Sequence, residues 1–388
     1  MRILQIADWT SNPGGIEVCV ARLRETLSAG GDDVRLLTGS TGSQGDGTAD
    51  YVALASDRLA PQIGLQLVNP FAVARLRAAL REFQPDVVHV HMLETNLSTA
   101  LFLALRGVPT VVSVHFYKPI CPVGTKVLPD GTFCAVPAGT ICFRGGCQSL
   151  PAWLRDRPRY RLLRDGLARA RRVITSSRWM EAHLAVSGIA ADVVYPPVAD
   201  TVAAAARAAD PLFVYCGRLS AEKGVQLFVR AFARVLDAVP EARARVVGGG
   251  PEHAALEALA GRLGVGDAVD FVGRMPPDQV AGYVADAWAL VAPSLWAEPF
   301  GLVAAEAIAQ GVPVVASATG GFAETVEPAL SGILCANGSE QELADALRAI
   351  AARPLTVDPQ AIARIRARHS LERHGATMRS IYSAAAAA

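Results

Sequence analysis

No excess of charge of one sign is present in this 388-residue sequence, because 37 Lys and Arg residues face 36 Asp and Glu residues. A protein that holds nucleic acid mainly by charge needs a basic excess, so that class is disfavoured. No apolar run reaches the roughly 18 residues of a membrane span, since Arg106, Gly107 and Pro109 interrupt the best candidate, 97–114. The first residues, MRILQIADW, lack the apolar stretch of a secretory signal. We therefore expect a cytoplasmic protein.

Short β-branched runs alternate with Ala- and Leu-rich helical stretches along the whole chain. This alternation predicts an α/β protein whose parallel sheets carry helices on both faces. The expected strands are 2–6, 33–37, 87–91, 110–114, 172–175 and 193–194 in the first half, and 212–215, 243–247, 269–272, 289–291 and 312–316 in the second. Two such series in a chain of this length predict two doubly wound domains, 1–197 and 198–369. We place the join in the proline- and alanine-rich segment 196–211.

Three glycine-rich turns follow expected strands and precede expected helices. Gly14-Gly15 follows the first strand, Arg218 and Lys223 flank the turn that opens the second half, and Gly249 lies in the next turn. Glycine lets the backbone approach a phosphate, and paired cations at a strand end suit a diphosphate. Taken singly, the Gly14-Gly15 turn is equally compatible with a plain tight turn, and the Gly249 turn is a weak signal, whereas the place of Arg218 and Lys223 at a strand end disfavours two merely solvated cations. Neither G-x-G-x-x-G nor a Walker loop occurs, which disfavours dehydrogenases and P-loop enzymes.

The most informative segment is 293–306, where an apolar strand is followed by a loop and a helix expected to start near Pro299. Glu298 precedes this helix and Glu306 lies on it, which would separate the two carboxylates by about 12 Å. Carboxylates accept hydrogen bonds from vicinal hydroxyls of the kind that sugars carry. The amides expected at the helix start, free to meet a negative ligand, are those of Phe300, Gly301 and Leu302.

Three histidines lie on expected strands of the first half or directly after one. His115 ends the strand 110–114, at the edge where ligands bind in open parallel sheets. A histidine in such a place is more often structural than functional. His89 and His91 alternate on the strand 87–91, and metal binding by this pair is disfavoured because the sequence offers no third ligand.

Together these segments resemble the retaining GT-B glycosyltransferases of family 4. The matching segments are Gly14–Glu17, Val88–His91, Ser113–His115, Gly217–Leu219, Glu222–Gly224, Gly248–Pro251, Phe271–Arg274 and Glu298 with Glu306. The similarity covers nearly the whole chain and is more specific in the second half. It implies two Rossmann-like domains that face a cleft, with a last helix at about 370–384 that packs back on the first domain.

The resemblance implies transfer of a hexosyl group from a UDP- or GDP-sugar to a hydroxyl acceptor, with retention of the anomeric configuration. Arg218 and Lys223 would neutralise the leaving diphosphate, so that no catalytic cofactor is expected, and Glu306 would bind the ribose. Glu298 would hold the donor sugar, and His115 would touch that sugar near the reacting carbon.

The same resemblance gives roles to the remaining donor-side positions. The Gly14-Gly15 loop would close over the phosphates, and the backbone of Arg274 would meet the base. The amides at Phe300, Gly301 and Leu302 would join Glu298 in holding the sugar. A sugar-nucleotide epimerase of the same architecture and an inactive nucleotide-sugar-binding protein are the alternatives.

Four cysteines fall within the proline-rich segment 116–150, expected to be a long loop. They are Cys121, Cys134, Cys142 and Cys147. Four thiolates can hold a structural zinc ion or an iron–sulfur cluster, although no C-x2-C pair is present. We expect a metal here slightly ahead of four free thiols, and disulfides are disfavoured in a cytoplasm.

An arginine-rich stretch follows this loop. Residues 155–172 contain eight arginines and two aspartates. Such a stretch is typical of a solvated helix, and it also suits peripheral contact with the anionic inner face of a membrane.

Overall fold

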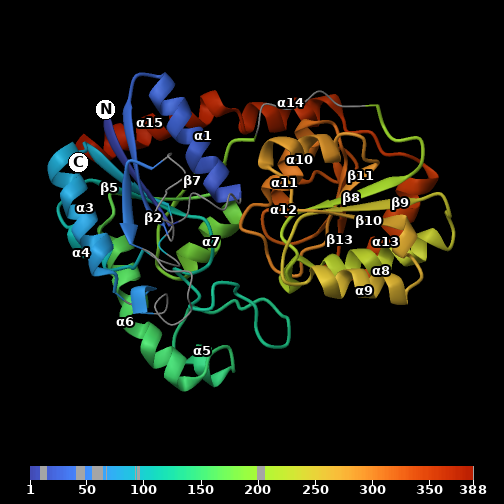
Figure 1. The fold of residues 1–388 in the computed structure, drawn as a ribbon, viewed down its shortest axis with the longest axis horizontal. Helices are drawn as coiled ribbons and strands as arrows, with labels where there is room; N and C mark the ends of the chain where they lie inside the picture. Colours follow the sequence, from blue (N-terminus) through green and yellow to red (C-terminus); the bar gives the residue numbers. More distant parts are fainter. Residues whose placement is uncertain are drawn as a thin grey trace. The chain divides into compact units, whose positions relative to one another are not determined.

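The computed structural model describes residues 1–8, 15–40, 49–54, 64–66, 68–91, 93, 97–198 and 206–387. The chain divides into two compact units, here called unit 1 and unit 2 (Figure 1). Unit 1 consists of Met1–Pro197 and Leu371–Ala388, and unit 2 consists of Val198–Ser370.

Unit 1 contains one parallel sheet, with strand order β3-β2-β1-β4-β5-β6-β7. Its strands are β1 (Arg2–Ala7), β2 (Asp33–Ser40), β3 (Tyr51–Leu54), β4 (Val87–Val90), β5 (Thr110–Val114), β6 (Arg172–Thr175) and β7 (Asp192–Val193). Its helices are α1 (Gly15–Ala29), α3 (Pro70–Phe83), α4 (Leu101–Ala104), α5 (Ile141–Arg144), α6 (Leu150–Arg169), α7 (Arg178–Val186) and α15 (Leu371–Ala387).

Unit 2 also contains one parallel sheet, with strand order β10-β9-β8-β11-β12-β13. Its strands are β8 (Leu212–Cys216), β9 (Arg243–Val247), β10 (Val269–Gly273), β11 (Ala289–Ala292), β12 (Val314–Ser317) and β13 (Gly332–Cys335). Its helices are α8 (Val225–Leu236), α9 (His253–Arg262), α10 (Pro277–Val284), α11 (Leu302–Ala309), α12 (Phe322–Thr325), α13 (Glu340–Ala352) and α14 (Pro359–Arg368). Two short 3-10 helices, η1 (Ala221–Lys223) and η2 (Gly266–Ala268), complete it.

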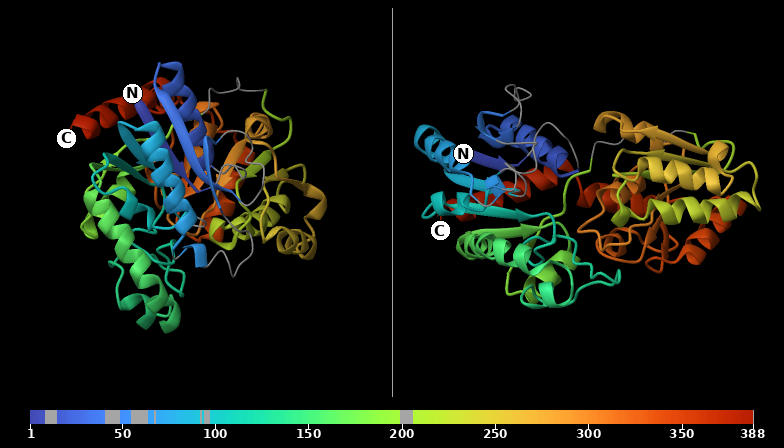
Figure 2. Two further views of the ribbon diagram at one scale, coloured as in Figure 1. Left: turned by 60° about the vertical axis from the view of Figure 1, so that its left-hand side comes forward. Right: turned by 60° about the horizontal axis from the view of Figure 1, so that its bottom comes forward.

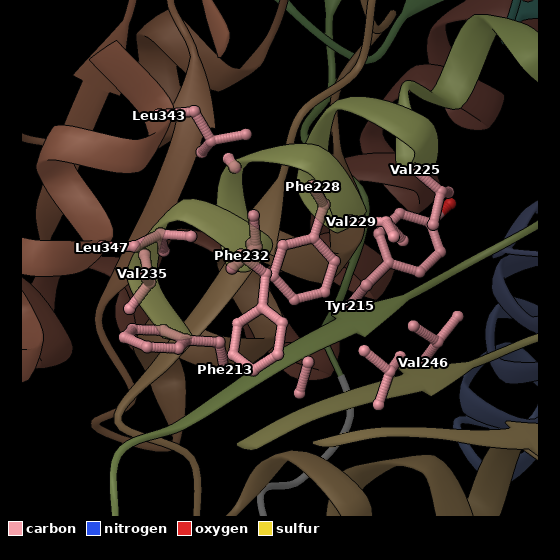
Figure 3. Packing of buried hydrophobic residues seen from close by; sticks show 14 of the residues in the cluster. Phe213, Tyr215, Val225, Phe228, Val229, Phe232, Val235, Val246, Leu343 and Leu347 are labelled. Atoms are coloured by element: carbon pink, nitrogen blue, oxygen red, sulfur yellow. The ribbon is translucent and has the colours of Figure 1, made fainter. Parts of the chain in front are cut away.

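The core of unit 2 shows why this sequence folds as a helix-covered sheet. Helix α8 buries Val225, Phe228, Val229, Phe232 and Val235, whose spacing of three and four residues forms one apolar stripe. This stripe packs against the sheet and against α13 (Figure 3). This burial holds α8 against the face of the sheet that contains β8. The turn between β8 and α8 is therefore held at the carboxyl end of β8.

Helix α15 belongs to unit 1 although it ends the chain. It lies beside α1 (Figures 1 and 2), and its Met378 and Tyr382 are fully buried among strand residues such as Ile3. Arg379 donates to Asp32 at 2.8 Å. This neighbouring arginine and the amino terminus hold the pKa of the Asp32 carboxyl below its usual value, although desolvation, the largest single influence, acts to raise it. Unit 1 is thus completed by the last segment of the chain.

The prediction of two parallel sheets is confirmed, and each of the eleven expected strands has a counterpart among the strands described above. The edge strands β3 and β13 were not expected. Both have only four residues, and β3 buries only every second side chain, as an edge strand does. The segment 116–150 is also more ordered than a plain loop, since it contains α5 and a bridge between Val127 and Phe133.

Candidate active site

Unit 2 places its candidate residues where the strand order reverses. Strands β8 and β11 are neighbours in the sheet, while the chain continues from β8 outward to β9 and from β11 outward to β12. Ligands of open α/β sheets bind beyond the carboxyl ends of the strands at such a point. Lys223 lies in the turn after β8, and Glu298 lies in the loop after β11.

An ion pair joins these two loops. Lys223 donates from Nζ to Glu298 Oε1 at 2.6 Å, and Ser294 Oγ donates to the same oxygen at 2.7 Å. The Glu298 residue is only 7% exposed, so its charge depends on these two donors. The Lys223 ammonium also lies over the ring of Trp296, 5.3 Å from the centroid. Because an ammonium has three N–H donors, Lys223 keeps donors for a bound anion.

The backbones of the two loops are fixed to each other as well. The amide of Leu295 donates to the carbonyl of Glu222 at 2.9 Å. Gly224 has a φ of +68°, and a Cβ at this position would lie 2.0 Å from the Pro293 carbonyl oxygen. Only glycine fits such a close approach in a left-handed conformation. The Lys223–Glu298 pair is therefore set by rigid backbone rather than by flexible side chains.

A second set of close backbone contacts joins the turns after β8 and β9. The Leu219 amide donates to the Gly249 carbonyl at 3.0 Å. A Cβ on Gly248, whose φ is +149°, would lie 1.8 Å from the Gly217 carbonyl oxygen. Tyr215 donates from its hydroxyl to the Arg218 carbonyl at 2.8 Å. These contacts place Arg218 on a fixed turn at the edge of the sheet.

The loop after β12 supports the Glu298 loop from the other side. The amide of Gly321 donates to the Glu298 carbonyl at 2.7 Å. A Cβ on Gly320 would lie 2.3 Å from that same oxygen. The glycine pair therefore lets one loop lie flat against the other, and the orientation of Glu298 depends on both.

The expected helix start near Pro299 is wrong. Helix α11 begins at Leu302, and Gly301 precedes it with a φ of +81°, a left-handed conformation that interrupts the helical path. Residues 298–301 are therefore loop, and the distance of about 12 Å that assumed a continuous helix from Glu298 does not apply. Leu302 is the first helical residue, while Phe300 and Gly301 lie in the supporting loop.

Glu306 lies on α11 with a half-buried side chain among buried alanines. Burial, followed by the negative charge of Glu306, raises the pKa of the Cys216 thiol to about 12. Cys216 is the last residue of β8, and α11, which carries Glu306, follows the loop that contains Glu298. The chain thus brings Glu306, Glu298, Lys223 and Arg218 to one edge of the sheet of unit 2.

The remaining donor-side positions are divided between the two units. Arg218 and Arg274 are exposed, and a Cβ on Gly249 would lie 3.5 Å from the Cβ of Arg274. In unit 1, Gly15 is the exposed first residue of α1, and Gly14 lies outside the described residues.

His115 belongs to a histidine cluster in unit 1. Its Nε2 lies 3.4 Å from His91 Nδ1, and the two rings are stacked. His89 is fully enclosed and bonded to Tyr382 at 2.6 Å and to Ser113 at 2.7 Å. Burial, and secondarily the charge of His374, lower the pKa of His115 to about 4. His115 is therefore a neutral imidazole at pH 7.

The structure does not arrange the four clustered cysteines as a metal site. Among the described residues, which include all four, no group of three or more His, Cys, Asp or Glu side chains could hold a metal ion. All four are free thiols, and Cys134 directs its Sγ toward the Val136 carbonyl at 3.7 Å. Burial raises the pKa of Cys142 and of Cys147, which favours the thiol over the metal-binding thiolate. The expected zinc ion or iron–sulfur cluster is therefore unsupported.

Several contributing residues were not singled out in the sequence. Ser294 and Trp296 contact Glu298 and Lys223, but a serine and a tryptophan in a loop carry no signal of that role. The Gly320-Gly321 pair follows β12 as the other glycine turns follow their strands, so this signal was present in the sequence.

Comparisons with known proteins identify the family. A model described as "Glycosyl transferases group 1" matches residues 201–367, and one described as "Glycosyl transferase 4-like domain" matches residues 14–199. A D-inositol 3-phosphate glycosyltransferase of Kribbella flavida is 33% identical over 374 residues, which cover 89% of this chain and 84% of that protein. The chain belongs to the group 1 glycosyltransferases of the GT-B fold.

A second relative agrees with this assignment, and two solved structures share the fold. The glycosyltransferase is 30% identical to a D-inositol 3-phosphate glycosyltransferase of a Nocardioides species, over 88% of this chain and 78% of that one. Sucrose-phosphate synthase from Thermosynechococcus elongatus matches with a TM-score of 0.77 and 24% identity, over 98% of both chains. The Anabaena protein HepE, solved in complex with UDP and glucose, matches with a TM-score of 0.71 and 20% identity, over 99% of both chains.

The predictions of a GT-B fold and of glycosyltransferase activity are confirmed by these relatives. In the part of the glycosyltransferase that the structure describes, no helix combines the length and apolar character needed to span a bilayer.

Proposed function

We propose that this glycosyltransferase moves a hexosyl group from a UDP-sugar to a hydroxyl acceptor with retention of the anomeric configuration. The observation that carries the proposal is the Lys223–Glu298 pair at the strand-order reversal of unit 2, beside the exposed Arg218. The complex of the HepE relative with UDP and glucose supports a uridine nucleotide.

The charges at this edge suit departure of a nucleoside diphosphate. Glycosyl transfer develops positive charge on the sugar and negative charge on the leaving phosphate. Lys223 and Arg218 would meet that negative charge, and they stabilise the transition state more than the ground state because the charge grows during the reaction. Their fixed backbone means that little reorganisation accompanies the step.

The two carboxylates would orient the donor. Glu306 would accept hydrogen bonds from the ribose hydroxyls, and the base would lie against the backbone near Arg274 and Gly249. Glu298, with the amides at Phe300–Leu302, would hold hydroxyls of the transferred sugar. Oε1 of Glu298 already accepts from Lys223 and Ser294, which makes this carboxylate a better hydroxyl acceptor than nucleophile.

Unit 1 would supply the acceptor side. His115, neutral at pH 7, would contact the donor sugar near its reacting carbon without adding positive charge there. The turn at Gly14-Gly15 would approach the phosphates. In this proposal the positive charge at the leaving group comes from Arg218 and Lys223, and no catalytic cofactor is required.

A thermal-shift panel of UDP, GDP, ADP, NAD and their sugar conjugates tests the donor. We expect the uridine nucleotides to raise the melting temperature by several degrees at about 100 times their dissociation constant. Proton NMR of the product then reports the anomeric configuration, and recovery of an epimerised donor would favour the epimerase alternative. A flat response to every nucleotide would favour a degenerate site.

Replacement of Glu306 by alanine tests the assignment of the ribose contact. We expect Glu306→Ala to weaken UDP binding at least tenfold, with an unchanged circular dichroism spectrum, because the side chain is only half-buried. Glu257→Ala, on the exposed face of α9, is the control. Full transferase activity in Glu306→Ala would refute the assignment.

A further inference from the structure

A cavity lies in unit 1 beyond the carboxyl ends of β4 and β5. Apolar side chains from β4, β5, α4 and α6 line it, among them Val90, Val112, Phe102 and Leu163. The volume of the cavity that the centre of a water molecule can occupy is about 60 Å³. This corresponds to about four water molecules, or to a carbon chain of about the same number of atoms.

Two buried polar atoms of the residues that line this cavity lack hydrogen-bond partners in the described part of the chain. They are Nε2 of His91, a residue 5% exposed, and Oγ1 of Thr99, a residue 1% exposed. A buried polar group without a partner is costly, so both atoms favour a ligand that can hydrogen-bond. A hydroxyl group suits them because it both donates and accepts.

The cavity is next to an open groove over the start of α6. Pro122, Asp156 and Tyr160 line both, and the groove continues along Trp153 and Leu154. The same part of the chain carries several exposed hydrophobic side chains. Large hydrophobic side chains of residues 123–154 that are 40% exposed or more are Val123, Val136, Ile141, Leu150 and Leu154.

We propose that this cavity and groove bind the acceptor, and that the acceptor is an amphiphilic alcohol with an aliphatic or aromatic body. Its hydroxyl end would lie at His91 and Thr99. His91 in turn contacts His115. Its apolar body would fill the cavity and leave along Tyr160 toward Trp153 and Leu154. The role of this alcohol as the acceptor rests on the proposed function. Its binding to the cavity and groove does not.

Small alcohols test the inference directly on the full chain. Each buried methylene strengthens binding about fourfold, so 1-hexanol should bind at least tenfold more tightly than ethanol. The isomer 1-methoxypentane has the same number of heavy atoms but no hydroxyl donor, and it should bind several-fold more weakly than 1-hexanol. Saturation-transfer NMR at millimolar ligand, with unchanged circular dichroism, measures these ratios.

Adjacent leucines of α6 provide the matched variants. Leu163 lines the cavity, whereas Leu162 lines neither the cavity nor the groove. Leu163→Phe should weaken binding of 1-hexanol at least tenfold, and Leu162→Phe should leave it within twofold. Thr99→Val should reduce the preference for 1-hexanol over 1-methoxypentane.

The outcomes separate this inference from the proposed function. Equal binding of ethanol and 1-hexanol, no binding of either, or equal effects of the two leucine variants would overturn it. Hydrolysis of a UDP-sugar in water is measured beside binding, because it requires only the donor site. If the protein hydrolysed a UDP-sugar but did not bind 1-hexanol, the proposed alcohol site would be refuted and the donor site would stand. If 1-hexanol bound and Leu163→Phe removed this binding, the alcohol site would be supported even without turnover of a donor.

Discussion

The edges of the two sheets that carry the candidate residues differ in chemistry. In unit 2, short glycine-rich loops hold charged groups in contact, with Lys223 and Glu298 at 2.6 Å. In unit 1, the carboxyl ends of β4 and β5 meet neutral histidines and an apolar cavity, and a segment of 35 residues, 116–150, extends the edge. The charged edge fits the diphosphate leaving group proposed above, and the apolar edge fits the alcohol proposed above.

The largest expected effect is on the charged edge. Lys223→Ala should lower transferase turnover by about 10²- to 10³-fold, because one preorganised donor to the developing charge is lost. It should also destabilise unit 2, because the buried Glu298 would lose the Lys223 ammonium as a donor and keep the Ser294 hydroxyl. Steady-state kinetics and denaturant unfolding measure the two effects.

A surface pair on the same unit is the control for Lys223. Arg234 and Glu340 form an exposed pair at 3.8 Å, so Arg234→Ala should change neither quantity appreciably. Comparable losses of turnover and of unfolding free energy in Arg234→Ala and Lys223→Ala would mean that Lys223 acts only through stability.

Substitution of glycine compares the rigidity of the two edges. Gly248→Ala forces a Cβ to within 1.8 Å of the Gly217 carbonyl oxygen at a φ of +149°, and should cost about 3 kcal/mol of unfolding free energy. Gly131→Ala in the segment 116–150 also has a positive φ, +86°, but meets no atom within 4 Å, and should cost about 1 kcal/mol. Chemical denaturation followed by circular dichroism gives both values, and equal values would contradict the difference in packing.

Acid should lower the unfolding free energy of unit 1 more than that of unit 2. Burial holds the pKa of His115 at about 4 and that of His91 and of His89 well below 6.5, so the unfolded chain binds more protons between these values. Stability is therefore complete above pH 6.5 and falls as the pH drops toward 4, by up to about 3 kcal/mol for His115 alone.

Hydrogen exchange between pH 7 and pH 5 resolves this effect for each unit. Amides of β4 and β5 should lose protection while those of β8 and β11 keep it. His115→Asn should reduce the loss, and a uniform loss across both sheets would contradict the assignment to the histidine cluster.

The smallest expected effect is on the unfolding free energy when either of two buried tyrosines loses its hydroxyl group. Tyr382→Phe removes the hydrogen bond to His89 at 2.6 Å, and Tyr215→Phe removes the bond to the Arg218 carbonyl at 2.8 Å. Each should lower the unfolding free energy by about 1 kcal/mol. Only Tyr215→Phe should also raise the Kd for UDP, because it releases the turn that carries Arg218; calorimetric titration with UDP distinguishes them.

The grouping of the candidate residues of unit 2 follows more directly from the sequence than the contacts within unit 1, for a physical reason. Arg218, Lys223 and Glu298 lie within short segments whose turns and glycines are readable locally, so their common edge follows from strand topology alone. The contact between His89 and Tyr382 joins positions 293 residues apart, and no local pattern indicates it.

The misplaced helix start has a local cause, whereas the missed cavity has a tertiary one. The start of α11 was misplaced because Pro299 suits a first helical turn, whereas the left-handed Gly301 delays the helix to Leu302. The cavity of unit 1 depends on how α6 packs against β4 and β5, a tertiary property that its arginine-rich sequence does not reveal.

The placement of α15 has a consequence for synthesis on the ribosome. Unit 2 is one continuous segment, Val198–Ser370, whereas unit 1 needs the last helix to bury Met378 and Tyr382 in its core. The later-made unit can therefore finish folding before the earlier-made one. Until α15 emerges, the core residues that Met378 and Tyr382 cover stay open, so a nascent chain stalled near position 370 should present this apolar surface to chaperones and proteases.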